Sequence, residues 1–415
     1  METKGLADCK VFESRGGYQA LKKALSMPPK DIIETVKKSG LRGRGGAGFP
    51  TGNKWGFVPQ NSGKPIFLLC NADESEPGTF KDRLLMEKNP HRLIEGIAIS
   101  SFAVNSHKAY IYIRGEYAKA ASILERAVEQ AYSAGYLGKR ILGSSFDLEL
   151  VVHRGAGAYI CGEETGLISS LEGKKGQPKL KPPFPAVSGF LGCPTVVNNV
   201  ETLFTVPWIV EHGGEKYAAY GTEQSKGTKL FSISGWVNKP GVYEEELGAS
   251  LKDFIEYYAG GMKGGAKLKA VIPGGSSTPP LTAEEVEKAT LDMESMAKLG
   301  TFLGSGGIIV IPDQLCLVKL VERIAEFYWD ESCGQCTPCR EGTGWLYKMV
   351  ASIEHGNGKE VTLEDIKKTG RNMMGVTICP LSDAAAMPIL GFVQKFPDEF
   401  LEHIRAKRCP YGETH

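Results

Sequence analysis

Four cysteines have the residue type and spacing of a metal-cluster site. Cys333, Cys336 and Cys339 are each separated by two residues, and the distant Cys379 stands directly before a proline. Two-residue gaps bring three thiolates to one side of a turn, and a remote cysteine can complete the ligand set. Zinc more often takes two separated pairs of ligands. The pattern therefore predicts a 4Fe-4S cluster, with structural zinc or an unmetallated group of thiols as the alternatives.

A second candidate site is the glycine-rich segment at residues 41–52. Its Gly43, Gly45 and Gly48 satisfy the string G-x-G-x-x-G, but residues 17–40 before them have the apolar spacing of helices. The usual dinucleotide fingerprint follows a strand, so we reject that assignment, and no Walker A string occurs in the sequence. Successive glycine amides can still surround an anion. The alternative is a flexible surface loop.

Charged and aromatic side chains around these glycines fit a nucleotide ligand. Arg44 and Lys54 can neutralise a phosphate. Flat surfaces for a ring come from Phe49, Trp55 and Phe57. The segment is therefore expected to bind a ligand with both a phosphate and a ring.

The following residues alternate between strand and helix patterns. Strands are predicted at residues 66–70, 109–113 and 146–152, and helices at 83–103, 117–134, 163–171 and 200–210. This alternation predicts an α/β fold with a parallel sheet. Because ligands of such sheets bind at the carboxyl ends of strands, the segments after the strands are the places to search.

Two of those strand ends are acidic. Residues 71–78 follow the first predicted strand and residues 154–165 follow the third, and their acids are Asp73, Glu74, Glu76, Glu163 and Glu164. Carboxylates here can accept hydrogen bonds from ribose hydroxyls or a carboxamide, and Asn71 can bind the edge of a heterocycle. Their negative field favours NAD over its 2'-phosphorylated relative. For any single acid, a solvated turn is the alternative.

Two further segments extend this candidate surface. Residues 180–185 form a stiff, proline-rich stretch that presents Lys181 and Phe184, with a rigid connector or an SH3-type ligand as alternatives. Asn198 and Asn199 stand at a predicted helix start, where unpaired amides favour a phosphate or another polar ligand.

The rest of the chain predicts two other folds. Residues 229–312 have the order strand, strand, helix, strand, strand, which suggests a β-grasp, or ubiquitin-like, module. Helices are predicted at residues 315–328, 344–353, 363–373 and 389–404. They suggest a four-helix bundle with the cysteine triplet at one helix junction.

Composition excludes several classes of protein. The 49 lysines and arginines balance the 48 aspartates and glutamates, so the charge expected of a nucleic-acid binder is missing. We expect no direct membrane insertion, because no apolar stretch reaches spanning length, and no secretion signal at the N-terminus. The other six cysteines are scattered singly and are expected to be small core residues in a reducing compartment, namely Cys9, Cys70, Cys161, Cys193, Cys316 and Cys409.

Long strings of this sequence resemble one known family. They are RGRGGAGFPTG-x-KW, CNADESEPGTFKDR, GAYICGEET, LKPPFP, VVNNVET and ESCGQCTPCREG with a late ICP. In this order they are similar to the flavin-bearing, NADH-oxidising subunit of respiratory complex I, the family of the 51 kDa or F-type subunits. The resemblance runs over nearly the whole chain. It implies a noncovalent FMN, NADH as substrate and one 4Fe-4S cluster.

The resemblance also implies a role for individual residues. FMN would be bound by Gly43, Arg44, Gly45, Gly46, Lys54, Asn71, Asp73, Glu74, Tyr159, Gly162, Glu163, Asn198 and Asn199. NADH would contact Phe49, Phe57, Glu76, Glu164, Lys181 and Phe184, with Glu163 bordering both ligands. The cluster would be held by Cys333, Cys336, Cys339 and Cys379.

Four domains are expected on this basis. They are an N-terminal helical segment reaching into the glycine-rich loop (1–51), an FMN- and NADH-binding Rossmann-like α/β domain (52–225), a β-grasp domain (226–313) and a helical bundle with the cluster (314–415).

The expected reaction follows from electron counts. NADH gives two electrons as a hydride, whereas a 4Fe-4S cluster accepts one, so a flavin must stand between them. No side chain is expected to act as acid or base; Glu76, Glu163 and Glu164 would orient the ligands. The electrons would then reach quinone through a larger complex.

The resemblance implies partners and a location as well. These are a small 2Fe-2S subunit of the 24 kDa type, a large iron-sulfur subunit, and a cytoplasmic position peripheral to the inner face of the membrane. The alternative is the diaphorase subunit of a soluble NAD-linked hydrogenase or formate dehydrogenase. Many of those carry extra iron-sulfur modules, which we do not find in this sequence. A zinc-binding scaffold without enzymatic activity is the remote alternative.

Overall fold

The computed structural model describes residues 5–412. The chain divides into two compact units. The first comprises Met1–Ser75, Phe80–Leu230 and Glu244–Gly248, and the second comprises Glu76–Thr79, Phe231–Tyr243 and Ala249–His415.

A four-stranded parallel sheet is the centre of the first unit. Its strand order is β3 (Glu149–Arg154), β2 (Lys108–Ile113), β1 (Phe67–Ala72) and β4 (Thr195–Asn199). Leu68, Leu69 and Cys70 of β1 are fully buried, as expected for a central strand that is covered on both faces. The first three strands add in one direction and β4 returns to the other side of β1. This reversal is the topological switch point at which α/β sheets bind ligands.

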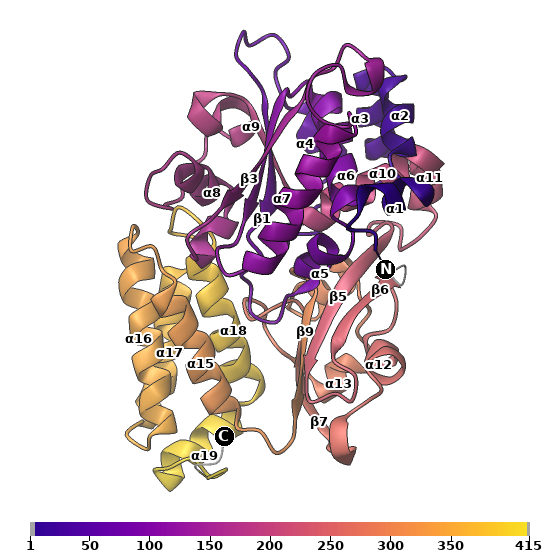
Figure 1. Ribbon diagram of the computed structural model, residues 1–415. Coiled ribbons are helices and arrows are strands. Elements are labelled where there is room, and N and C mark those ends of the chain that lie inside the picture. The colour runs from indigo at the N-terminus through magenta and orange to yellow at the C-terminus, as the bar shows by residue number, and fades with distance from the viewer. Residues whose placement is uncertain (1–4, 413–415) are drawn as a thin grey trace. The chain divides into compact units, whose positions relative to one another are not determined.

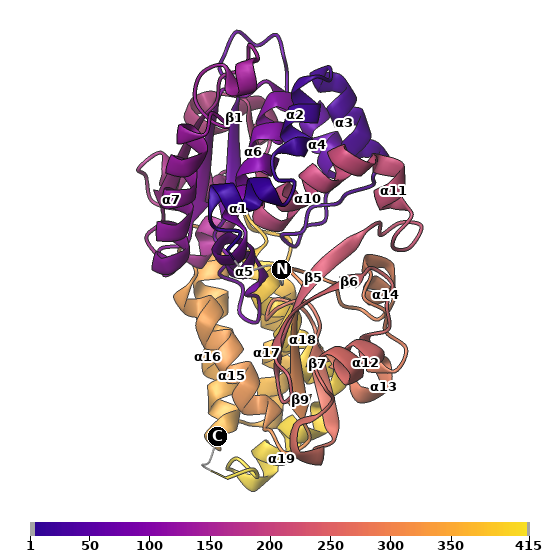
Figure 2. The same cartoon turned by 45° about the vertical axis from the view of Figure 1, so that its right-hand side comes forward.

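Helices cover both faces of this sheet. Figure 1 shows α7 (Ala118–Ser133), α6 (Pro90–Val104) and α10 (Val200–His212) on one face, with α8 (Glu164–Leu171) and α9 (Pro185–Ser188) on the other. Figure 2 brings the first face forward, with the shorter N-terminal helices beside it. The remaining helices of the unit are α1 (Cys9–Ser14), α2 (Gln19–Leu25), α3 (Pro29–Lys38), α4 (Thr51–Gly56), α5 (Lys81–Lys88) and α11 (Gly214–Ala218).

The helix predicted over residues 83–103 is in fact two helices. Helix α5 ends at Lys88, and α6 begins at Pro90, which has no amide hydrogen to continue the hydrogen-bond ladder of α5. The side chain of Asn89 accepts a hydrogen bond from the amide of Arg92 at 3.2 Å and so caps the new helix. The third strand is also displaced from its predicted range, 146–152, and lies at Glu149–Arg154.

A five-stranded mixed sheet lies mainly in the second unit, although its residues 228–230 and 244–246 are assigned to the first. Its order is β6 (Gly241–Glu246), β5 (Thr228–Gly235), β9 (Gly307–Pro312), β7 (Leu268–Ile272) and β8 (Leu281–Thr282). Strands β5 and β9 are parallel, whereas β7 is antiparallel to both β8 and β9. The strand, strand, helix, strand order agrees with the predicted β-grasp module. Its helix starts as α12 (Leu251–Asp253) and continues as a π-helical turn at Phe254–Tyr258, and the short helices α13 (Ala283–Val286) and α14 (Met293–Lys298) follow β8.

Helices form the rest of the second unit. Figure 1 shows α15 (Leu317–Asp330), α16 (Thr337–Glu354), α17 (Glu360–Met373) and α18 (Leu381–Lys395) as a bundle, with α19 (Pro397–Ala406) across one end. The prediction of a single helix over residues 389–404 is wrong. Helix α18 starts eight residues earlier, at Leu381, and Pro397 starts the separate α19 because a proline fits the first turn of a helix but not its interior.

Candidate functional site

The glycine-rich loop connects α3 to α4, so a helix precedes it, as the sequence predicts. The amide of Gly43 donates to the carbonyl of Phe49 at 2.9 Å, which closes the loop on itself. Gly46 and Gly48 have φ values of +135° and +64°, which side chains other than glycine rarely allow. A Cβ on Gly45 would lie 3.0 Å from Cβ of Asn199, so the loop packs directly against the end of β4.

The ends of the two central strands meet at this loop. Asn71 of β1 and Asn199 of β4 are partners in the parallel register. The amide group of Asn71 donates to the carbonyl of Gly162 at 2.8 Å and thereby connects the segment after β3. The indole of Trp55 donates to Asn198 at 2.9 Å and connects α4. Four separate stretches of the predicted site therefore converge at the switch point of the sheet.

Lys54 and Lys181, which are predicted to contact the ligands, take part in a chain of ion pairs beside β4. Lys54 Nζ lies 2.9 Å from Glu164 Oε2 and donates to the carbonyl of Val197, also at 2.9 Å. Lys181 Nζ lies 2.6 Å from the other oxygen of Glu164 and 3.1 Å from Glu163. Burial opposes ionisation of Glu164, but Lys54 and Lys181 together hold its pKa below the ordinary value. Glu164 is therefore an anion at neutral pH, and a ligand phosphate would have to share Lys54 with it.

Glu163 also caps the start of α8. Its carboxylate accepts hydrogen bonds from the amides of Thr165 and Gly166 at 2.8 and 2.9 Å. It is thus the N-terminal cap of α8, where a negative charge is favoured by the helix dipole. The cap fixes the direction of its remaining oxygen.

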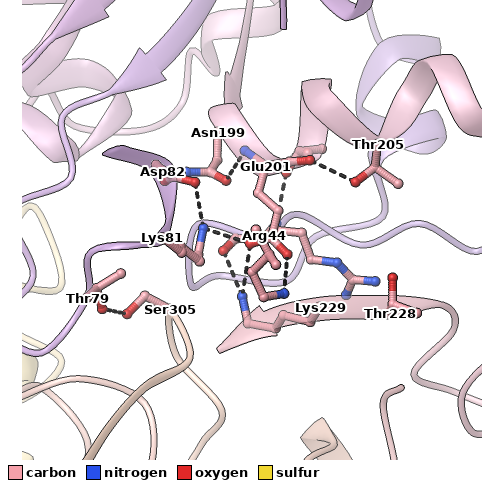
Figure 3. Close-up of polar contacts among 12 residues, drawn as sticks. Arg44, Thr79, Lys81, Asp82, Asn199, Glu201, Thr205, Thr228, Lys229 and Ser305 are labelled. Atoms are coloured by element: carbon pink, nitrogen blue, oxygen red, sulfur yellow. Dashed lines mark hydrogen bonds and ion pairs between the residues drawn. The ribbon is translucent and has the colours of Figure 1, made fainter. Parts of the chain in front are cut away.

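A buried group of charges that no sequence motif predicted lies next to the loop (Figure 3). Lys81 Nζ lies 2.7 Å from Glu201 Oε2 and 2.8 Å from Asp82 Oδ1. Lys229 Nζ lies 3.6 Å from Glu201 and donates to the carbonyl of Arg44 at 3.1 Å. The other oxygen of Glu201 accepts from the amide of Leu230 at 2.8 Å. Lys81, Asp82 and Glu201 lie within the family strings, but no property of those strings predicts their contact.

Electrostatics in this group favour the ionised acid. Burial opposes the charge of Glu201, but Lys229, Lys81 and Arg44 hold its pKa below the ordinary value. Burial would also lower the pKa of Lys81, yet Asp82 and Glu201 outweigh it and raise that pKa. For Lys229 burial wins and lowers the pKa to about 7, although Glu201 opposes the shift. Lys229 is therefore the member of this group that loses its proton most readily.

Arg44 is predicted to contact FMN, and the described residues leave part of its guanidinium without hydrogen-bond acceptors. Its Nη2 donates to Tyr217 and to the carbonyl of Lys226, at 2.9 and 2.8 Å, and its amide donates to Thr202 at 2.9 Å. The side chain is 1% exposed, and within residues 5–412 neither Nε nor Nη1 has a hydrogen-bond partner. Buried guanidinium donors are costly when unpaired. An anionic ligand at the loop fits this shortage of acceptors.

Asp73 and Glu74 are more enclosed than the sequence suggests. Asp73 accepts a hydrogen bond from the hydroxyl of Ser75 at 2.9 Å. Glu74 accepts from the amides of Asp82 and Arg83, at 2.7 and 2.9 Å, and so binds the start of α5. Burial and the neighbouring Asp82 raise the pKa of Glu74 to about 7. Glu74 therefore positions α5 through both carboxylate oxygens.

The remaining residues predicted for the nucleotide site are three exposed aromatic side chains and the separate residues Tyr159 and Glu76. Phe49, Phe57 and Phe184 are 47%, 60% and 58% exposed, and the rings of Phe49 and Phe57 have centroids 6.1 Å apart. Exposed aromatic rings of this kind can stack on a base. Tyr159 begins the single turn Tyr159–Gly162. Glu76 belongs to the second unit, where it accepts a hydrogen bond from the amide of Ser277 at 2.8 Å.

The four cysteines predicted to hold the cluster lie in, or directly after, two neighbouring connections of the helical bundle. Cys333 and Cys336 lie between α15 and α16, Cys339 lies in the first turn of α16, and Cys379 lies between α17 and α18. The Sγ atom of Cys336 accepts from the amide of Ile378 at 3.4 Å, so the segment of the fourth cysteine lies against the triplet. Ser332 contacts Sγ of Cys339 at 3.3 Å. Four thiols from these two connections fit the ligand set of a 4Fe-4S cluster.

No helix within residues 5–412 combines the length and the apolar content that crossing a bilayer requires.

Comparisons with known families agree with this arrangement. Residues 36–208 match the family model of the Nuo51 FMN-binding domain, and residues 319–403 match the NADH-ubiquinone oxidoreductase-F iron-sulfur binding region. Residues 229–311 match the SLBB domain. The chain is 52% identical to the F 2 subunit of NADH-quinone oxidoreductase of Rhizobium meliloti (strain 1021), over 97% of this chain and 95% of the relative. This chain belongs to the family of NADH-quinone oxidoreductase F subunits.

Other relatives of this F-type chain are similarly close. The F subunit of NADH-quinone oxidoreductase of Mycobacterium tuberculosis (strain ATCC 25618 / H37Rv) is 51% identical, over 95% of this chain and 89% of the relative. Among solved structures, the NAD+-reducing NiFe-hydrogenase in the air-oxidized state matches with a TM-score of 0.85 and 37% identity. That match covers 97% of this chain and 66% of the hydrogenase chain. The predicted family, its FMN-binding domain and its 4Fe-4S region are thus confirmed.

Proposed function

We propose that FMN binds at the switch point between β1 and β4, with its phosphate at the amides of the glycine-rich loop. The observation that carries this proposal is the register pairing of Asn71 with Asn199, because it brings the loop and three strand ends to one place. The two unpartnered donors of Arg44 support an anion there. The residues that would contact FMN are Gly43, Arg44, Gly45, Gly46, Lys54, Asn71, Asp73, Glu74, Tyr159, Gly162, Glu163, Asn198 and Asn199.

NADH would lie over the flavin on the exposed side of this site. Phe49, Phe57 and Phe184 have the exposed ring faces that an adenine needs. Glu164 and Lys181 already face one another at 2.6 Å, so they can exchange this ion pair for hydrogen bonds to hydroxyls of the nucleotide. Glu76 would add a further acceptor. The cap formed by Glu163 gives its carboxylate a fixed position at the border of both ligands.

The reaction is electron transfer in two stages. When bound, FMN can accept a hydride from NADH and release its electrons singly to a 4Fe-4S cluster. In this proposal the residues of the chain bind and orient the ligands, and none acts as an acid, base or nucleophile. Holding two rings in contact is worth several kcal/mol of a barrier when the geometry is well defined. Cys333, Cys336, Cys339 and Cys379 would hold the cluster.

We also propose partners and a location for the chain. The chain would occupy a peripheral position on the cytoplasmic side of the membrane, bound to a small 2Fe-2S subunit of the 24 kDa type and a large iron-sulfur subunit. The four predicted domains, 1–51, 52–225, 226–313 and 314–415, would divide these tasks. The similar hydrogenase structure supports a second candidate, a diaphorase subunit, but this chain spans only 66% of the hydrogenase chain.

An anaerobic visible spectrum of the purified chain, with and without NADH, tests the reaction. We expect flavin absorbance that bleaches with NADH, and about four irons per chain. NADPH should bleach it far more slowly, because the acidic strand ends repel an extra phosphate. A flavin that is absent after reconstitution, or that does not respond to NADH, would refute the proposal.

The partners need a separate experiment. The chain is isolated under mild conditions from its native cells, and the proteins that accompany it are identified. Quinone-reactive membrane subunits are the expected result. A nickel-iron, iron-iron or molybdenum subunit instead would establish the diaphorase alternative.

A further inference from the structure

The second unit contains a group of metal-ligating side chains that the 4Fe-4S region does not use. They are Cys316, Glu354, His403 and Cys409, each of which offers one ligand atom, and these atoms all lie within 4.8 Å of one another. Cys316 stands directly before α15, Glu354 is the last residue of α16, His403 lies in α19 and Cys409 follows α19. We propose that these four residues bind a structural zinc ion.

The separations among three of the ligand atoms are close to those of a tetrahedral zinc site, and all four lie within 4.8 Å of one another. Cys316 Sγ lies 3.2 Å from His403 Nε2 and 3.5 Å from Glu354 Oε2. His403 Nε2 lies 3.3 Å from Glu354 Oε2. Zinc bonds of about 2.3 Å to sulfur and about 2.0–2.1 Å to nitrogen or oxygen put tetrahedral ligand atoms roughly 3.3–3.8 Å apart. A small adjustment of these side chains is therefore enough to bind the ion.

The histidine already has the orientation of a metal ligand. Its Nδ1 lies 2.7 Å from the carbonyl oxygen of Glu399, so that nitrogen carries the proton, and in a neutral ring Nε2 then has a free lone pair. Metal-bound histidines usually donate their other ring nitrogen to such an acceptor. The ring of His403 is fully buried and stacks on Tyr411 at a centroid distance of 6.3 Å. Its rotation is therefore restricted.

The thiol at the start of α15 is equally well placed. Sγ of Cys316 accepts a hydrogen bond from the amide of Lys319 at 3.3 Å. This hydrogen bond holds the sulfur beside His403 and Glu354. Two sulfurs, one imidazole and one carboxylate form a borderline-soft ligand set, which favours zinc over magnesium or calcium.

This site lies at the opposite end of the bundle from the cluster cysteines. Cys316 precedes α15, whereas Cys333 follows it, and the 14 residues of α15 span about 20 Å. Zinc has no redox chemistry of its own, so the ion would join the ends of α15, α16 and α19 and would carry no electrons. Cys316 is buried, as expected, but its neighbours Glu354 and His403 are polar, and Cys409 is only partly buried.

Elemental analysis and zinc K-edge X-ray absorption of the full chain test the proposal without interference from iron. We expect about one zinc per chain, with two sulfur and two nitrogen or oxygen neighbours. Three findings would each overturn it. These are absence of zinc after growth in zinc-supplied medium, a first shell of four sulfurs, which would place the metal at the triplet, and a disulfide between Cys316 and Cys409.

Substitutions of the proposed ligands test where the zinc ion binds. Cys409→Ser and His403→Gln should each lose most of the zinc, whereas Cys193→Ser, a partly exposed cysteine of the first unit, should retain it. Flavin and iron contents of the same samples report whether each variant has folded. Full zinc retention in Cys409→Ser would overturn the proposal. If either variant fails to fold, the absorption spectrum of the unaltered chain decides alone.

Discussion

Glu201 is the anion that two buried lysines share. In Glu201→Gln, Lys229 loses the acid that it contacts and Lys81 retains Asp82 alone. Removing one member of a buried ion pair typically costs about 3–5 kcal/mol, because the remaining charge stays in the interior. We expect a loss of this size in the free energy of unfolding, measured by urea titration of flavin fluorescence. Glu211→Gln, an exposed site on the same helix, is the control. Equal losses in both variants would contradict the buried-charge argument.

The buried carboxyl group of Glu95 should make the stability of the fold depend on pH. Burial raises its pKa to about 7, although the amide of Leu21 donates to it at 3.0 Å. A raised acid pKa means that the folded state retains a proton that the unfolded chain releases. Stability should therefore fall as the pH rises from the ordinary pKa towards 7, by about 2 kcal/mol between pH 5.5 and 8.

Glu95→Gln should remove this part of the pH dependence. Urea midpoints of the variant and the unaltered chain, measured across that pH range, provide the comparison. Glu129→Gln, an exposed position of α7, should keep the original slope. An unchanged slope in Glu95→Gln would show that Glu95 has no raised pKa.

At the scale of elements, the contact of α6 with α10 depends on one glycine. A Cβ on Gly96 would lie 2.0 Å from the carbonyl oxygen of Leu203, which neither backbone can accommodate in place. Alanine favours a helix over glycine by about 1 kcal/mol. The steric clash should outweigh that gain, so Gly96→Ala should lower the free energy of unfolding by several kcal/mol.

Gly56→Ala provides the matched control for this helix contact. Gly56 also lies in a helix, α4, but its added Cβ would meet only Lys37 at an ordinary distance of 3.7 Å. This variant should be as stable as the unaltered chain or slightly more stable. If Gly96→Ala were stabilising, the close approach of the two helices would be refuted.

At the scale of the whole molecule, the two proposed redox sites belong to different compact units. The glycine-rich loop and the strand ends lie in the first unit, and all four cluster cysteines lie in the second. Cys379→Ser should therefore remove the iron-sulfur absorbance while NADH still bleaches the flavin at its original rate in anaerobic stopped-flow experiments. Electron transfer to quinone by the assembled complex should fall to background.

Cys193→Ser is the control for this separation. It changes a cysteine of the first unit that belongs to neither redox site, so both absorbance bands and quinone reduction should stay unchanged. Loss of flavin reduction in Cys379→Ser, with the flavin still bound, would show that the two sites do not function independently.

The sequence by itself determined the features that depend on near neighbours. The spacing of Cys333, Cys336 and Cys339 brings three thiols to one turn whatever the rest of the fold. The helix before the glycines excluded the usual dinucleotide fingerprint. Parallel strands end at one edge of a sheet, so the polar segments after β1 and β3 could be expected together, whereas β4 was not predicted as a strand. Helix ends were less predictable: Pro90 and Pro397 divide segments whose apolar spacing continues through the break.

Only the tertiary structure decided which distant groups touch. The return of β4 to the side of β1 pairs Asn71 with Asn199, and no local pattern encodes that choice. The same holds for the ion pair of Lys81 with Glu201 and for the meeting of Cys316 with His403. A polar side chain is stable in the interior only when a partner compensates its lost hydration. Since these partners come from remote segments, their roles became visible only when the folded chain brought them together.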